Sequence, residues 1–384
     1  MNLRRVLAVA HKEWREIVRD RIYFLLAFLL PVMLMLVFGY GMSQDVENVA
    51  FAVLDEDRTP MSRDYAHHFI DSRYFSYQGH LMSAKEADRL LADRKVRVVI
   101  VIGPSFERRI LEGRGAEAQA LIDGTFTTSA RTIRAYVEAI NAAASARVQV
   151  GYLTRKLGLS TDEAIQLLQP VKLEVRYLYN QEVRSIWAVA PSLMMLILIL
   201  VPPLLMALSV VREKETGAIY NICASTITRA EFLAGKLLPI IGIAGANALI
   251  LWGIAVWYFG APFKGSAIFF VLATLTYVLC TTGLGLLISL LVKTQQAAMI
   301  ISTVLSVIIA IQFSGFITPA ASLQGGAWVV AHIFPALYYN DVVKGVFLKG
   351  VGFAVLWFDV AVFVLFACVV LVLCHALFRK RMRA

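Results

Sequence analysis

Six apolar runs, each long enough to cross a lipid bilayer, constrain this chain more than any other feature of its sequence. About 20 apolar residues can span the hydrocarbon layer as a helix, because a helix satisfies its own backbone hydrogen bonds there. With 59% hydrophobic and 17% charged residues, the chain is too apolar for one soluble domain. The predicted transmembrane helices are 22–42, 185–211, 237–259, 266–292, 297–319 and 351–378.

Between the first two runs lies a polar stretch, residues 43–184, that is long enough for an independent domain. It alternates short strand-like segments with segments of helical periodicity. We therefore expect an α-helical membrane protein with six transmembrane helices and an inserted α/β domain. The expected strands are 49–54, 97–102, 118–122 and 171–177, and the expected helices are 62–70, 84–93, 106–112 and 128–157.

The basic residues predict the orientation, because they favour the cytoplasmic side of a membrane. The short loops on the opposite side offer only Lys264, Lys344 and Lys349. Both termini, including a tail at 379–384, and the loop 212–236 are therefore expected in the cytoplasm, and the α/β domain outside. The cytoplasmic basic residues are Arg4, Arg5, Lys12, Arg15, Arg19, Arg21, Arg212, Lys214, Arg229, Lys236, Arg379, Lys380, Arg381 and Arg383.

The net charge of +10 belongs to the parts that flank the membrane. Residues 45–180 hold 18 basic and 18 acidic side chains, so the expected outer domain is neutral. The excess lies where anionic lipid headgroups favour it, which makes membrane lipids an expected partner. No soluble face collects the charge, so nucleic acid is not an expected partner.

The spacing of apolar side chains in residues 1–21 predicts an amphipathic helix that lies in the inner headgroup layer. Such a helix is either a simple membrane anchor or a surface on which a partner subunit rests, and both interpretations stay open. Its apolar side chains recur at helical spacing, opposite most of the charged ones: Leu3, Val6, Leu7, Ala10, Trp14, Ile17 and Val18.

The sequence predicts no enzyme. The phosphate-binding pattern G-x-x-x-x-G-K-[ST] does not occur in it, and neither a nucleophile, base and acid set nor a metal-ligand spacing is legible. The turn at 55–60 contains three acids that could hold a hard cation, but it is better interpreted as a solvated turn that caps the helix after Pro60. We expect no cofactor and no metal on this chain.

Two sets of short motifs resemble ABC-2 type exporter permeases. One lies in the expected cytoplasmic loop: REKETG at 212–217, ASTITRAEFL at 224–233 and GKLLP at 235–239. The other precedes the last run: SGFITP at 314–319, FPALYY at 334–339 and KGVFLKG at 344–350. The six spans, both motif sets and the large loop after the first span come in that family's order, so the resemblance covers essentially the whole chain.

The resemblance implies a permease subunit of a bacterial inner membrane. Such a subunit pairs with a second permease, identical or paralogous, and docks a separate cytoplasmic ATPase that binds the ATP. A large domain after the first span resembles the drug-efflux branch, whose members often work beside a periplasmic adaptor protein. The implied function is therefore export of small amphipathic or drug-like compounds.

Two other functions stay open. An ion-coupled secondary carrier would show inverted repeats and charged residues near mid-membrane, and Asp359 is the one acid found within a run. A membrane receptor or assembly protein that does not transport would use the outer domain to bind a partner. Co-purification of a separate ATPase would distinguish the permease from both.

Candidate functional residues follow from these expectations. The loop 212–236 is bracketed by two spans, so force on it would move both, and the charged residues expected to contact the ATPase are Glu213, Glu215, Arg229 and Glu231. Polar residues within or beside the spans are candidates for a transport path: Asn247, Gln312, Ser314 and Asp359.

Asp359 is singled out because an acid within a membrane is expensive to bury and is by default a functional candidate. It could instead be a structural tether to Lys344 or Lys349, and the sequence leaves the two roles open. Proline and glycine residues break the preceding segment, 320–350, which is expected to form short re-entrant helices at the outer side.

Overall fold

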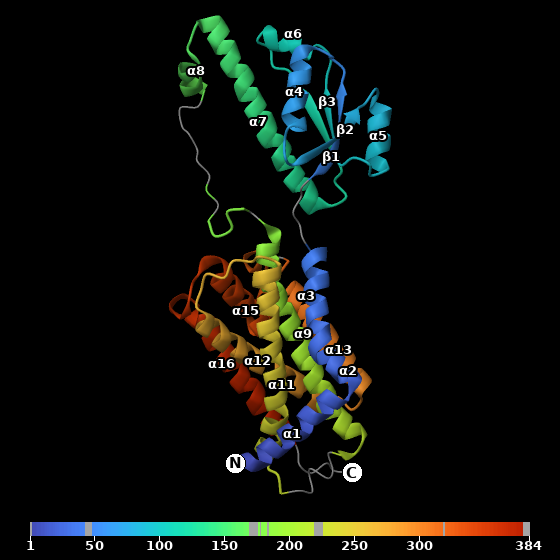
Figure 1. The fold of residues 1–384 in the computed structure, drawn as a ribbon, viewed down its shortest axis with the longest axis vertical. Coiled ribbons are helices and arrows are strands. Elements are labelled where there is room, and N and C mark those ends of the chain that lie inside the picture. The colour runs from blue at the N-terminus through green and yellow to red at the C-terminus, as the bar shows by residue number, and fades with distance from the viewer. Residues whose placement is uncertain are drawn as a thin grey trace. The chain divides into compact units, whose positions relative to one another are not determined.

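The computed structural model describes residues 2–42, 48–168, 176, 178–182, 184–218, 226–317 and 319–378. The chain divides into two compact units: residues 1–43 with 177–384 form a helical unit, and residues 44–176 form an α/β unit. Figure 1 shows both as ribbons.

The helical unit begins with α1 (Leu3–Arg19), after which the carboxylate of Asp20 accepts hydrogen bonds from the first backbone N–H groups of the next helix. The first span is α2 (Arg21–Phe24), a π-helical turn (Leu25–Leu29) and α3 (Leu30–Gly41). The next spans are α9 (Ser185–Glu215), α11 (Arg229–Gly253) with a π-helical extension (Ile254–Tyr258), α12 (Ala267–Leu291), α13 (Gln295–Gln312) and α16 (Phe353–Leu377).

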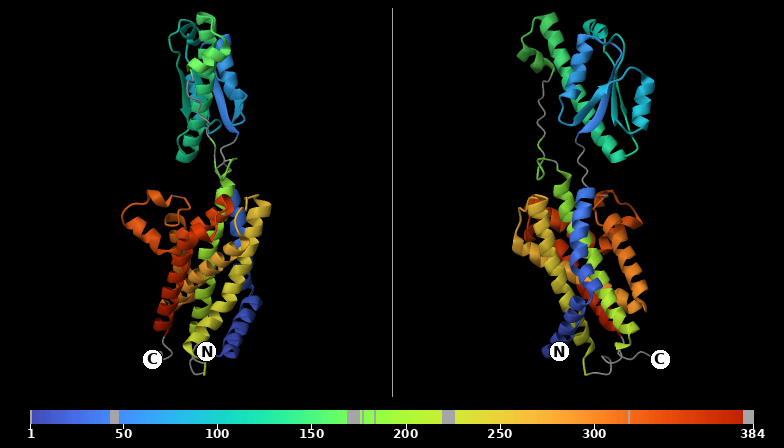
Figure 2. Two further views of the ribbon diagram at one scale, coloured as in Figure 1. Left: turned by 90° about the vertical axis from the view of Figure 1, so that its left-hand side faces the viewer. Right: turned by 45° about the vertical axis from the view of Figure 1, so that its right-hand side comes forward.

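Within the described residues, these are the six helices long and apolar enough to cross a membrane, which confirms the helical membrane fold. Before the last of them lie a 3₁₀ turn (Ala320–Ser322), α14 (Gly326–Ile333), and α15 (Pro335–Lys344) with a π-helical end (Gly345–Lys349). These elements occupy the expected re-entrant segment and are too short to cross a bilayer. Figure 2 shows α14 projecting from one side of the helical unit, whereas α15 packs against α9, α12 and α16.

Helix α9 is the central helix of this unit. Of its most apolar 18-residue stretch, 94% is buried, because α3, α11, α12, α13 and α15 all contact this helix. At Gly285 of α12 an added Cβ would lie 2.5 Å from the Cα of Pro203, so the missing side chain lets the two helices touch. By contrast, the first span, α13 and α16 are only 28%, 28% and 22% buried, so most of their surface faces outward.

The α/β unit contains a four-stranded sheet in the order β2-β1-β3-β4. Strand β1 (Val49–Asp55) pairs in parallel with β2 (Phe75–His80) and β3 (Val98–Ile102), and β4 (Ala118–Ile122) pairs antiparallel with β3. The helices are α4 (Pro60–Ile70), α5 (Ala84–Ala92), α6 (Phe106–Leu111), α7 (Thr127–Leu157) and α8 (Thr161–Leu168).

Side chains that alternate along β1 explain why both faces of this sheet are covered. Phe51 and Val53 pack into a core with α4 and α7, whereas Ala52 and Leu54 pack into a second core with α5. The strand is therefore apolar throughout, as expected for one buried on both faces. Figure 1 shows α4 and α7 on one side of the sheet and α5 on the other.

Three of the expected strands and all four expected helices of this unit are found within a few residues of their predicted ends. The fourth expected strand, 171–177, lies outside the described residues except for Arg176. Strand β2 and helix α8 were not predicted. The turn caps α4 as expected, since the Thr59 side chain accepts a hydrogen bond from the backbone N–H of Ser62 at 3.3 Å, and Asp55 accepts hydrogen bonds from the N–H groups of Asp57 and Arg58 within the turn.

Candidate functional site

Helix α1 has two apolar faces, one exposed and one packed against other helices. Leu3, Leu7, Trp14 and Val18 are between 44% and 64% exposed, as an interfacial anchor requires. The other face packs against α11 and is formed by Val6, Val9, Ala10, Glu13 and Ile17. Figure 1 shows α1 running across the ends of α9 and α11.

Close approach of α1 and α11 depends on Gly235, the glycine of the GKLLP motif. A Cβ at Gly235 would lie 2.6 Å from the Cβ of Val9 and 3.0 Å from the carbonyl oxygen of Val6. Real Cβ atoms do not come this close to other atoms, so a larger residue would push the helices apart. The next residue of the motif, Lys236, can therefore reach across to α1.

Lys236 lies at the centre of a buried charge cluster between α1, α9 and α11, which we call the three-helix cluster. Its ammonium group donates hydrogen bonds to the Glu13 carboxylate and, at 3.0 Å, to the Ser209 hydroxyl, and it lies 3.0 Å from the Glu213 carboxylate. Ser209 donates its hydroxyl proton to Glu13. The cluster comprises Lys12, Glu13, Glu16, Ser209, Glu213 and Lys236.

Three charged side chains of this cluster are buried, so their stability depends on one another. The side chains of Lys236, Glu13 and Glu213 are 1%, 3% and 5% exposed, so each charge depends on its partners for the solvation that water no longer gives. Lys12 closes the cluster at its solvent edge, with its Nζ 2.5 Å from Glu213 Oε1 and 3.5 Å from Glu16 Oε1. Burial lowers the pKa of Lys12, but the hydrogen bonds and negative charges of Glu213 and Glu16 together outweigh it and raise that pKa above its ordinary value.

Carboxylate oxygens of Glu13, Glu16 and Glu213 lie within 4.8 Å of one another, a spacing at which a metal ion could bind. The ammonium groups of Lys12 and Lys236 already lie against these oxygens. Two ammonium groups of the protein thus offset two of the three carboxylate charges.

Both ends of α1 are also tied to the neighbouring helices. At the beginning, Glu231 of α11 accepts hydrogen bonds from the backbone N–H of Asn2 at 2.6 Å and of Thr228 at 2.9 Å, and lies 3.8 Å from Arg5. At the end, Arg212 of α9 donates to the carboxylate of Asp20 at 2.8 Å. Helix α1 is thus a strap held at three points along its length.

The last turn of α9 binds two further helices. Lys214 donates to the carbonyl oxygens of Ser289 and Val292, where α12 ends. Glu215 accepts hydrogen bonds from the backbone N–H of Gln295 at 2.8 Å and from its side chain, where α13 begins. Consecutive residues of the REKETG motif therefore hold both sides of the turn between α12 and α13.

The four residues expected to contact the ATPase occupy different environments. Glu213 and Glu231 are only 4% and 2% exposed, and both bind groups of this chain. Their carboxylates therefore do not face a docking partner in this conformation. Glu215 is exposed and Arg229 is half-buried. The structure brings Glu213 together with Lys236 but does not gather all four residues at one place.

A charged hollow of about 740 Å³ lies beside the three-helix cluster, between α1 and the end of α9. Its lining combines the solvent edge of the cluster with exposed basic side chains of α1. These lining residues include His11, Lys12, Arg15, Arg19, Arg212 and Thr216. The hollow is a concave surface that a partner with acidic side chains could enter.

Asn247 is a contact between helices. Its side-chain amide donates to the carbonyl oxygen of Ala27 at 2.6 Å. That carbonyl has no donor four residues along its own helix, because the residue there is Pro31 and proline lacks an N–H. Asn247 is 2% exposed, so it supplies a bond that water cannot.

The remaining path candidates are dispersed. Gln312 is exposed at the end of α13, and the buried Ser314 donates its hydroxyl to the carbonyl of Ala310. Asp359 is half-buried on α16, and among the described residues it makes no ion pair with Lys344 or Lys349.

Lys344 instead takes part in a contact between the motifs of the second set. It donates to the carbonyl of Gly315 at 3.3 Å, and Asn340 donates to the carbonyl of Ser314 at 3.0 Å. Next to Asn340, Tyr339 stacks on Tyr277 with ring centroids 3.9 Å apart. The motif at 314–319 thus contacts Lys344 of the motif at 344–350 and Asn340, which directly follows the motif at 334–339.

The pairing of Glu13 with Lys236 was not predicted, although the sequence contains a signal for it. Each is a charged residue within an otherwise apolar stripe: Glu13 falls between Ala10 and Ile17 on the buried face of α1, and Lys236 follows Gly235 in α11. A charge on a buried face needs an opposite charge, so the two could have been paired from the pattern.

Comparisons with known proteins agree with the motifs. A family model described as ABC-2 family transporter protein matches residues 21–375. The probable multidrug ABC transporter permease YbhS of Escherichia coli is 28% identical over 357 residues, which cover 91% of this chain and 90% of that protein. YbhR of the same organism, also named a probable multidrug ABC transporter permease, is 27% identical over 356 residues and 92% of each chain.

A third relative is the linearmycin resistance permease protein LnrN of Bacillus subtilis. It is 24% identical over 305 residues, which cover 77% of this chain and 78% of LnrN. Since the family model matches nearly the whole chain and the six apolar helices agree with it, this protein is a multi-pass membrane permease that belongs to the ABC-2 family of transporter proteins.

Proposed function

We propose that this chain is the permease subunit of an exporter that moves small amphipathic or drug-like compounds outward across a bacterial inner membrane. A separate cytoplasmic ATPase supplies the energy, and a second permease, identical or paralogous, completes the membrane pathway. The names of YbhS and YbhR support a multidrug cargo. Both termini and residues 212–236 are on the cytoplasmic side in this proposal, and the α/β unit is outside.

The observation that carries the proposal is the strap formed by α1. Its three attachment points join it to α9 and α11, the spans on either side of the proposed coupling loop. A force applied to α1 or to the loop therefore reaches two spans through buried ion pairs and through the close contact at Gly235. Glu213 and Glu231 act in coupling by holding these helices together.

The ATPase docks, in this proposal, at the charged hollow between α1 and α9 and at the exposed charges beside it, Glu215 and Arg229. The hollow offers the exposed cations Arg15 and Arg19 to acidic side chains of the ATPase, and it is continuous with the three-helix cluster through Lys12 and Glu213. Docking there would place the ATPase directly against the strap.

Co-purification of the ATPase with charge-reversed permeases tests this docking surface. Arg15→Glu changes a basic residue that lines the hollow, and Arg4→Glu changes an exposed arginine on the same helix that does not line it. Losing a close charge pair at an interface costs about 2–5 kcal/mol, so Arg15→Glu should weaken docking roughly tens-fold or more, and Arg4→Glu much less. Equal retention of the ATPase by both variants would place the docking surface elsewhere.

Cysteine labelling tests the orientation separately. Cysteines at Arg4 and Ser225 should react only with a reagent applied from the cytoplasm, and one at Asp123 only from outside. Labelling of the Asp123 position from the cytoplasmic side would overturn the orientation, and with it the role of the loop 212–236. Whether a periplasmic adaptor takes part is tested by crosslinking through the same Asp123 cysteine.

A further inference from the structure

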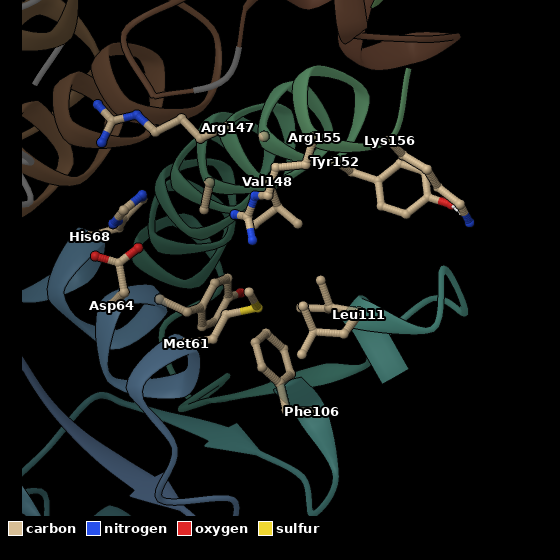
Figure 3. A pocket seen from close by; sticks show the side chains of 14 residues that line it. Met61, Asp64, His68, Phe106, Leu111, Arg147, Val148, Tyr152, Arg155 and Lys156 are labelled. Carbon is tan, nitrogen blue, oxygen red and sulfur yellow. Dashed lines mark hydrogen bonds between the residues drawn. The ribbon is translucent and has the colours of Figure 1, made fainter. Parts of the chain in front are cut away.

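A groove in the α/β unit combines an apolar wall with basic side chains. It lies between α7 on one side and α4 and α6 on the other, and it encloses a cavity of about 410 Å³, within the usual range for small-molecule sites. A second hollow of similar volume adjoins it and shares Tyr65, Phe106, Ile110, Ala144, Val148 and Tyr152. Figure 3 shows the side chains around the first hollow.

The groove exists because α7 is longer than the sheet that it covers. The first half of α7 packs on the sheet through Ile133, which is 1% exposed. Farther along, the small residues Ala144 and Gly151 face the gap, which leaves room between α7 and α6. The opposite wall is aromatic, since Tyr65 of α4 and Phe106 of α6 pack with ring centroids 5.4 Å apart.

The charges of the lining residues are unbalanced. Three cations, Arg147, Arg155 and Lys156, face a single acid, Asp64. Among the described residues neither Arg147 nor Arg155 makes an ion pair, whereas Lys156 donates a hydrogen bond to the hydroxyl of Tyr152.

The positions of these cations match a ligand with one acidic group. In Figure 3 the guanidinium group of Arg155 reaches back over the cavity, and Arg147 lies at the end near His68. The Arg155 side chain folds back along α7, since one of its guanidinium nitrogens lies 3.5 Å from where a Cβ of Gly151 would be.

We propose that this groove binds a small amphipathic organic anion. Its aromatic or aliphatic body would lie against Tyr65, Phe106 and Val148, and its carboxylate, sulfonate or phosphate group beside Arg155 and Arg147. Arginine is suited to this role because its planar guanidinium group can form two parallel hydrogen bonds to such an anion. The apolar wall excludes inorganic anions as good ligands, and the cations disfavour cationic amphiphiles.

The test is fluorescence titration of the full-length protein in nanodiscs made of zwitterionic lipid, with empty nanodiscs as background. Anilinonaphthalene sulfonate is the anionic probe, and phenylnaphthylamine, which has the same ring system without the sulfonate, is the neutral probe. Arg147→Gln/Arg155→Gln removes the two unpaired cations. Arg131→Gln/Arg134→Gln removes two exposed arginines of α7 that do not line the groove, and it is the matched control.

We expect saturable binding of the anionic probe to the unaltered protein. Arg147→Gln/Arg155→Gln should raise its dissociation constant about tenfold or more, while the control pair changes it less than about twofold and binding of the neutral probe is kept. Val148→Trp, which fills the groove from a half-exposed position, should abolish binding of both probes. Equal binding of the anionic probe by both arginine variants would overturn the proposal, as would a lack of saturable binding to the unaltered protein.

An acyl-chain anion and an aromatic anion present the same chemistry to this groove. Displacement of the probe by dodecanoate would assign the groove to acyl chains, and displacement by naphthalene sulfonate alone would assign it to aromatic anions. Displacement by neither would overturn the proposal. The assay measures binding and not export, so its result is independent of the transport function proposed above.

Discussion

Lys236 of α11 donates a hydrogen bond to Glu13 of α1, 223 positions away in the sequence, and both side chains are almost completely buried. Lys236→Met would leave the carboxylates of Glu13 and Glu213 buried without their central cation. Removing one partner of a buried pair typically costs about 3–5 kcal/mol. Thermal melting in detergent should therefore show a large loss of stability.

The matched control for this change is Lys12→Met, at the 44% exposed edge of the same cluster, where an ion pair contributes only about 0–1 kcal/mol. Adding Glu13→Gln to Lys236→Met should recover part of the stability, since one buried charge is then gone. If Lys236→Met melts like Lys12→Met, the cluster does not hold α1 in place.

Gly235→Ala tests the contact between α1 and α11. The added Cβ would meet Val9 and the backbone of Val6, so the helices must separate, at a cost of about 1–3 kcal/mol. Gly242, farther along α11, has no atom within 4 Å of the corresponding position, and there alanine should stabilise the helix slightly. Melting temperatures that move in the same direction for both variants would show that α1 does not depend on this approach.

The contact from Asn247 to Ala27 can be tested by a double-mutant cycle. Asn247→Leu leaves a buried carbonyl without a donor, which costs about 1–3 kcal/mol. In a Pro31→Ala background an N–H is restored four residues from that carbonyl, so the same change should cost less. An equal loss of stability in both backgrounds, measured by thermal unfolding, would assign Asn247 another role, and lining the transport path is then the first alternative.

The stability of α6 should depend on pH through the ionisation of the Asp57 carboxyl group. Ser105 makes no side-chain cap for this helix, and the Asp57 carboxylate accepts the hydrogen bond from the backbone N–H of Glu107 at 2.9 Å instead. This bond lowers the pKa of Asp57 from its ordinary value of 3.8. A lowered pKa means that the stabilisation is present above the ordinary value and is lost as the pH falls through the lower folded value.

Hydrogen exchange of the peptide that contains Glu107 measures this effect in the full-length protein. Asp57→Asn should speed exchange at neutral pH, in line with about 1 kcal/mol for a lost cap, and the difference from the unaltered protein should vanish at strongly acid pH. Asp88→Asn, at an exposed position on α5, is the control. A difference that persists unchanged after acidification would exclude ionised Asp57 as the cause.

Asp359→Asn separates a transport role from a structural one. Because Asp359 makes no ion pair with Lys344 or Lys349 among the described residues, we expect the variant to keep its melting temperature. We also expect it to export a cationic compound less well than a neutral one of similar size. Lower stability with normal export per folded molecule would instead show that the acid is a structural tether.

The sequence predicted the spans well because their length is set by the bilayer, but it misplaced the ends of some helices. The fifth span was expected to reach residue 319, whereas α13 ends at Gln312, ahead of Gly315, which adopts a φ of 73° that ends regular helix. Strand β2 was missed because it is a polar edge strand interrupted by Gly79, which also has positive φ.

Prediction of the candidate site from the sequence failed for a different reason. A charge run in a short loop predicts an outward contact, but Glu213 and Glu231 have partners on α1, 201 and 229 positions away. No local pattern reports such distant pairs. The sequence does show one charged residue on each of two apolar helix faces, Glu13 on α1 and Lys236 on α11. In the folded chain these two charges pair with each other.

The neighbouring residues Lys214 and Glu215 have a consequence for how α12 and α13 are joined. Lys214 lies at the carbonyl end of α12, where the aligned peptide dipoles concentrate negative charge, and Glu215 lies at the amide end of α13, where they concentrate positive charge. Two adjacent side chains thus recognise the opposite poles of two consecutive helices. Exchanging the pair would set a like charge against each pole, so the order lysine then glutamate is itself a determinant of the fold.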